Sequence, residues 1–186
     1  MFAEWRARRA LRAKAAAYVA TLFTDAPPRD VEWLATHGTG GDVDHARWEL
    51  RYARRAIGLL TAKRDALDDQ TASLVAHELA MGLATDPNID AGKLRVAEKQ
   101  LNTRLRAYGE ALSNREGAGS GWHLGRTLLE FAGRRDAVAP EIVAYAGELL
   151  ASYLAEANEA LRREFGTATL PEDVAPSSLG AGGRRA

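Results

Sequence analysis

The sequence predicts an all-α protein, and the spacing of its apolar residues carries that prediction. Over residues 43–67, apolar side chains recur at alternating steps of three and four, which places them in one stripe along a helix; they are Val43, Ala46, Leu50, Ala53, Ile57, Leu60 and Leu67. The same spacing returns over residues 94–112 and 142–161. No stretch alternates with the period of two that is typical of a strand. We therefore expect a helical bundle of about four long helices with shorter helices between them.

The first long helix is expected over residues 2–23 and ends before Pro27, because proline interrupts helical hydrogen bonding. A short helix over residues 30–36 leads into the glycine-rich run of residues 38–41, which allows a sharp reversal of the chain. Asp42 is the expected N-cap of the second long helix.

The middle of the chain is divided by aspartates. An aspartate pair at residues 68–69 separates the second long helix from a shorter one that is expected to end at Ala84. Residues 86–88, Asp-Pro-Asn, predict a turn. Asp90 then caps a third long helix that is expected to end near Asn114.

Residues 117–121 contain three glycines and predict a flexible link before the last two helices. Those helices are expected over residues 122–134 and 140–165, the second one started by a proline. We expect one helical domain over residues 1–166. Proline, glycine and serine dominate residues 167–186 and leave too little apolar content to fold alone, so the sequence predicts a disordered tail there.

Composition limits the classes of function. The chain has no cysteine, which excludes disulfides, thiolate metal sites and cysteine nucleophiles, and it fits the cytoplasm, the location we expect. The 25 basic and 25 acidic residues cancel, so the protein lacks the overall basic field of a dedicated nucleic-acid binder. The basic start and the apolar stretch of residues 15–23 have the size of an export signal. Pro27 would directly follow the only small-residue cleavage pattern, so the sequence fits an export signal poorly. No uninterrupted apolar stretch predicts a membrane span.

No metal, cofactor or catalytic residue is assigned from the sequence. The paired Glu-x-x-His motif of di-iron bundles is absent, and Asp42, which precedes His45 by three residues, is explained by helix capping. Glu49 lies one turn after His45, and Glu78 adjoins His77, but a hairpin of the two helices would keep the pairs apart.

Glu98 is the acidic residue that the spacing places among apolar neighbours. Its position relative to Leu94, Leu101 and Leu105 predicts that it lies within the apolar stripe of its helix. A buried carboxylate needs a partner or a shifted pKa, so we expect an ion pair, with a functional acid as the alternative. Together with histidines that neighbour tryptophans, Glu98 leaves open a metal- or small-ligand-binding bundle with a redox or carrier role.

The helix expected over residues 69–84 has apolar residues on two sides. Leu74 and Met81 lie on a different side from the apolar row of Val75, Leu79 and Leu83. One partner helix cannot cover both sides, so this helix is either central in the monomer or pairs with another subunit or protein.

The first 14 residues are strongly basic, with Glu4 their single acidic residue; the basic ones are Arg6, Arg8, Arg9, Arg12 and Lys14. The basic residues of such a helix are either simply exposed to solvent or contact anionic lipid or nucleic acid. The function we expect is that of a non-enzymatic interaction or assembly subunit that self-associates or binds another protein. Its predicted contact residues are Leu74, Met81, Arg6, Arg8, Arg9 and Arg12. Ligand binding and peripheral binding to an anionic membrane or nucleic acid are the alternatives.

Overall fold

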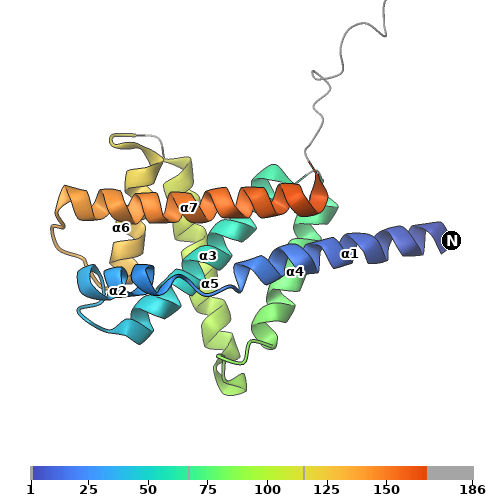
Figure 1. The fold of residues 1–186 in the computed structure, drawn as a ribbon, viewed down its shortest axis with the longest axis horizontal. Coiled ribbons are helices and arrows are strands. Elements are labelled where there is room, and N and C mark those ends of the chain that lie inside the picture. The colour runs from blue at the N-terminus through green and yellow to red at the C-terminus, as the bar shows by residue number, and fades with distance from the viewer. Residues whose placement is uncertain (1, 67, 115, 167–186) are drawn as a thin grey trace, which may run out of the picture.

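The computed structural model describes residues 2–66, 68–114 and 116–166, and over these residues the protein is all-helical, as predicted. Figure 1 shows the helices packed together. Their bounds are α1 (Phe2–Leu22), α2 (Pro28–His37), α3 (Val43–Asp65), α4 (Asp69–Ala84), α5 (Leu94–Ser113), α6 (Gly119–Phe131) and α7 (Pro140–Phe165), with a short 3-10 turn, η1 (Ala91–Lys93), before α5. The predicted tail over residues 167–186 lies outside the described residues.

Aspartates begin the middle helices. The Asp42 carboxylate accepts a hydrogen bond from the backbone N–H of His45 at 2.9 Å, which confirms it as the N-cap of α3. Asp68 accepts the N–H of Thr71 in the same way at the start of α4. Asp90 also caps, but it caps η1, and α5 begins only at Leu94. These carboxylates satisfy N–H groups that a helix start leaves without intrahelical partners.

The packing is organised around α3, which contacts every other helix of the described chain (Figure 1). The stripe residues Leu50 and Ile57 are buried, and so are Ala56 and Leu59 on other sides of the helix. A helix that is buried all round occupies the centre of a domain. Val43, the first residue of the predicted stripe, is exposed; it is also the first residue of α3. Figure 1 shows α4, α5 and α6 crossing the direction of α1 and α7 steeply.

The glycine-rich run of residues 117–121 is not the link that the sequence predicts. α6 already begins at Gly119, and its Gly121 and Gly125 lie against α7. A Cβ on Gly125 would lie 2.2 Å from the carbonyl oxygen of Val143, and a Cβ on Gly147 would lie 2.4 Å from that of Gly121. The two helices therefore pack backbone against backbone, and glycine is needed because any side chain would force them apart.

Glu98 is also placed differently from the prediction, because its side chain is exposed. The buried positions of α5 are Ala97, Leu101, Arg104, Tyr108 and Ala111. The buried side of α5 is rotated by about one residue relative to the predicted stripe. Arg104 rather than Glu98 therefore enters the core of the fold.

Candidate functional site

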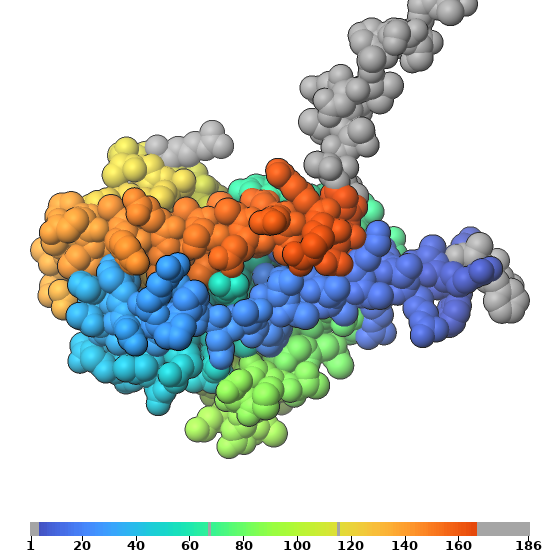
Figure 2. Space-filling view, viewed as in Figure 1, coloured from blue at the N-terminus to red at the C-terminus, as the bar shows by residue number. Residues whose placement is uncertain are grey.

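The N-terminal part of α1 extends beyond the body of the molecule (Figures 1 and 2). All side chains of residues 4–10 are exposed, and Ala15 is the first fully buried residue from residue 4 onward. At about 1.5 Å per residue, the stretch before Ala15 is about 16 Å long. We call residues 4–14 the basic arm, since five basic residues against Glu4 give it a net charge of +4. Trp5 in this arm is 59% exposed.

A surface hollow of about 520 Å³ lies where α1 and α4 meet, and we call it the α1–α4 hollow. Phe23, which directly follows α1, lies over Gly82 of α4 in this hollow, at a place where even a Cβ on the glycine would lie 2.7 Å from the ring. The lining comes from α1, α3, α4 and the turns that follow α1 and α4. It includes the side chains of Val19, Phe23, Asp25, Arg51, Arg55, Glu78, Met81, Asp86 and Asn88.

The two predicted contact residues of α4 have different environments. Met81 lines the hollow and is 47% exposed, whereas Leu74 is half-buried and packs against the core. The opposite row of Val75, Leu79 and Leu83 is buried, as expected. Met81 is therefore the residue of this pair that is open to a partner.

The basic arm is joined to α4 by an ion pair. The Arg12 Nε donates to Glu78 Oε1 at 2.7 Å, and the carboxylate is mostly buried while the guanidinium is mostly exposed. Arg9 lies with its guanidinium carbon 5.6 Å from the centre of the Trp5 ring. Arg6 and Arg8 are exposed. The structure thus brings all the predicted contact residues onto two helices that pack side by side, α1 and α4.

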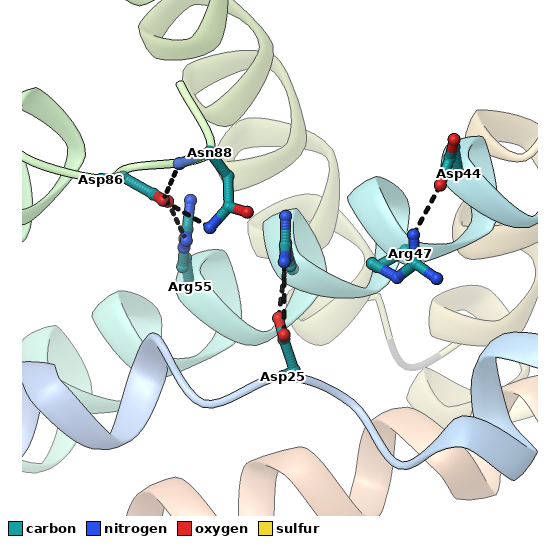
Figure 3. A network of polar contacts seen from close by, with 7 residues as sticks. Asp25, Asp44, Arg47, Arg55, Asp86 and Asn88 are labelled. Carbon is teal, nitrogen blue, oxygen red and sulfur yellow. Dashed lines mark hydrogen bonds and ion pairs between the residues drawn. The ribbon is translucent and has the colours of Figure 1, made fainter. Parts of the chain in front are cut away.

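A buried ion pair lies beneath the hollow. Arg55 of α3 is 2% exposed and donates through Nη2 to Asp86 Oδ2 at 2.6 Å (Figure 3). Asp86 also accepts the backbone and side-chain N–H groups of Asn88, each at 2.9 Å. Burial lowers the pKa of Arg55. Burial raises the pKa of Asp86, but the hydrogen bonds from Asn88 and Arg55 outweigh it, and the pKa lies below its usual range.

The Arg55 guanidinium also stacks on an aromatic ring, with its central carbon 4.1 Å from the centre of Phe23. This cation–π contact holds the ring over Gly82 and partly compensates for the burial of the charge. Asp86, Arg55 and Phe23 therefore form one connected unit that fixes the floor of the hollow.

A second ion pair closes the hollow on the side of the linker after α1. Arg51 donates through Nε and Nη2 to the two carboxylate oxygens of Asp25, at 2.7 and 3.2 Å (Figure 3). The hydrogen bond from Arg51 holds the pKa of the Asp25 carboxyl below its usual range. Because Asp25 is largely exposed, the pair is screened by water, and we expect it to position the linker more than to stabilise the fold.

A third pair, Glu49 with Arg104, joins α3 to α5. The Arg104 Nε donates to Glu49 Oε2 at 2.8 Å, and His45 Nε2 lies 3.3 Å from the other carboxylate oxygen. The Arg104 guanidinium lies between the rings of Tyr52 and Phe131, at 4.9 and 4.4 Å from their centres. Glu49, which the sequence pairs with His45 alone, is thus held mainly by an arginine from another helix.

The sequence reasoning missed these buried arginines, although a signal was present. Arg51 and Arg55 interrupt the most apolar part of α3, and Arg104 lies between Leu101 and Leu105. A charge inside an apolar stripe indicates a buried pair when an acidic partner is available on another element.

Three observations bear on other functions. In the described residues, no group of three or more histidine, aspartate and glutamate side chains is placed to hold a metal ion. No helix in the same residues combines the length and the apolar character needed to cross a membrane. Comparison of the chain with protein-family models, with curated proteins and with solved structures finds no match in any of the three.

Proposed function

We propose that this chain is a non-enzymatic helical subunit that self-associates through the side formed by α1 and α4. The observation that carries the proposal is the 47% exposure of Met81 at the edge of the α1–α4 hollow, on a helix whose opposite side is buried. Methionine adapts its shape to different apolar partners and is common on interaction surfaces. The hollow also presents charged and polar side chains that a partner of complementary charge can contact.

The rigidity of the floor supports this assignment. Arg55 is fixed by Asp86 and by the Phe23 ring, and Arg51 is fixed by Asp25. A surface whose side chains are already held in place loses little conformational entropy when a partner binds. A cytoplasmic location belongs to the proposal as well, and the absence of cysteine supports it.

Sedimentation velocity over a range of about 1 to 200 µM tests the proposal, since weak specific association falls in that range. The wild-type protein is expected to form a concentration-dependent oligomer. Met81→Asp places a charge at the edge of the hollow and is expected to weaken association about tenfold or more. Helicity by circular dichroism is expected to stay unchanged, because the side chain is not part of the core.

Val96→Asp is the matched control, because Val96 is 58% exposed on α5 and receives the same substitution away from the hollow. It is expected to associate as the wild type does. A wild-type protein that is monomeric at every concentration would contradict the proposal, and so would equal effects of the two variants.

A further inference from the structure

The charges of this neutral chain are unevenly divided. The basic arm carries +4, so the residues outside the first 14 carry 20 basic and 24 acidic side chains. Part of that acidic excess belongs to residues 68–90, which contain no lysine or arginine and which we call the acidic α4 segment. Its acidic residues are Asp68, Asp69, Glu78, Asp86 and Asp90. The basic arm therefore belongs to α1, and most of the acidic α4 segment belongs to α4, which packs against α1.

The position of the acidic α4 segment decides which partner the basic arm fits. A nucleic acid would be attracted by the arm but repelled by the acidic segment beside it, since its phosphates are negative along their whole length. A membrane surface needs a helix with one apolar and one basic side. Arg6, Arg9 and Arg12 share one side of α1 at 100° per residue, but Trp5 lies on that same side, and the opposite side carries mainly alanines rather than large apolar residues. A second copy of the chain offers the exposed carboxylates of the acidic α4 segment, Asp68, Asp69 and Asp90, whereas Glu78 and Asp86 are already paired within the chain.

We propose that the basic arm of one copy docks along the acidic α4 segment of a second copy, and that the reverse contact forms across a two-fold axis. The inference rests on the proposed self-association and adds the charged part of the contact. In a two-fold dimer each arm meets the partner's acidic segment, so every favourable pair occurs twice. The Arg12–Glu78 pair within one chain already joins a basic side chain of the arm to a carboxylate of that segment. The exposed Trp5 supplies apolar area beside the charges.

Reciprocal charge reversal tests this arrangement. The arm variant is Arg8→Glu with Arg9→Glu, and the segment variant is Asp69→Lys with Ser73→Lys; all these positions are exposed. In a homodimer of either variant, like charges face each other at both contacts, so each variant alone is expected to associate about tenfold or more weakly than the wild type. An equimolar mixture places glutamates opposite lysines at one contact and native charges at the other. The mixture is therefore expected to recover association.

Matched controls separate docking from a general charge effect. Arg95→Glu with Lys99→Glu makes the same change of charge as the arm variant on exposed positions of α5, and it is expected to associate as the wild type does. Added salt is expected to weaken the wild-type dimer more than it weakens the residual association of the arm variant, because salt screens exposed charges.

Several outcomes would overturn the inference. One is an arm variant that associates like the wild type while Met81→Asp does not, and this outcome leaves the proposed function standing. A mixture that fails to recover association is another. A third is binding of a mixed-sequence duplex, or of vesicles containing phosphatidylserine, that the arm variant loses while its self-association is unchanged. A wild-type protein that is monomeric at all concentrations would remove the proposed function together with the inference.

Discussion

The α6–α7 contact and the α1–α4 contact both depend on glycine, but they use it differently. Between α6 and α7, Gly125 and Gly147 bring the two backbones together. Between α1 and α4, Gly82 makes room for the ring of Phe23. The first contact is filled by main chain, whereas the second is filled by a side chain next to a hollow of about 520 Å³.

The α6–α7 contact is suited to stabilising the fold, whereas the α1–α4 side is suited to binding a partner. Two backbones in close contact cannot rearrange to fit a binding partner, so the α6–α7 contact contributes to the stability of the fold. The α1–α4 side carries an exposed methionine and charged groups held by buried partners, which are features of a surface prepared for contact. Substitutions in the α6–α7 contact are thus expected to change the free energy of unfolding, and substitutions at the edge of the hollow are expected to change association.

The largest expected effect is at Gly125. Gly125→Val adds a branched side chain whose Cβ alone would lie 2.2 Å from the Val143 carbonyl oxygen. Because the obstacle is backbone, α6 and α7 must separate, and the free energy of unfolding by urea is expected to fall by about 3 kcal/mol or more. Gly121→Ala is the control, since its Cβ would meet nothing within 4 Å. It is expected to be neutral or to stabilise the helix by about 0.5 to 1 kcal/mol, and equal losses would refute the backbone explanation.

The next effect is expected at the floor of the hollow. Asp86→Ala leaves the buried Arg55 cation without its carboxylate, and the free energy of unfolding is expected to fall by about 3 kcal/mol. Asp44→Ala removes the exposed pair with Arg47 (Figure 3) and is expected to cost less than about 1 kcal/mol. Combining Arg55→Met with Asp86→Ala removes both charges and is expected to recover part of the loss. A double variant less stable than Asp86→Ala would contradict this account.

The same carboxylates predict a loss of stability in acid. The pKa values of Asp86 and Asp25 are lowered in the folded state, so their contribution is fully present above the unfolded value of about 3.9 and is lost as the pH falls through the folded values. Unfolding by urea measured between about pH 7 and pH 2.5 is expected to show this loss below about pH 4. The Asp86→Ala variant is expected to lose less over that interval, and parallel curves for the two proteins would contradict the assignment.

The smallest effect on stability is expected at Met81. Met81→Ala removes a half-exposed side chain and is expected to change the free energy of unfolding by less than about 0.5 kcal/mol. Leu79→Ala on the buried side of the same helix is expected to cost about 2 kcal/mol or more. Thermal and urea unfolding of the two variants compares the two sides of α4 directly. A large loss at Met81 would show that this residue belongs to the core.

The positions of the helices could be predicted because they depend on local sequence. The spacing of apolar residues and the caps at Asp42 and Asp68 act within a few neighbouring residues, and the predicted helices agree closely with those of the structure. The periodicity of α4 places Met81 on a second apolar side but leaves open whether the monomer covers it, and in the structure it is 47% exposed.

The contents of the core could not be predicted in the same way. Whether Glu98 or Arg104 is buried depends on a rotation of α5 by about one residue, and both positions lie near the apolar stripe. The sequence predicts a flexible link over residues 117–121 because glycine is typical both of loops and of close helix contacts. The neighbouring helix decides between the two roles of glycine.

The sequence by itself determined an all-helical chain, a basic N-terminal helix, and a later helix with two apolar sides. Only the tertiary structure decided that Arg55 meets Asp86, that Arg104 meets Glu49, and that the basic arm extends beyond the body of the molecule (Figure 2). The physical reason is distance along the chain. Helix periodicity and capping act over a few residues, whereas a buried ion pair joins groups that become neighbours only when whole helices pack.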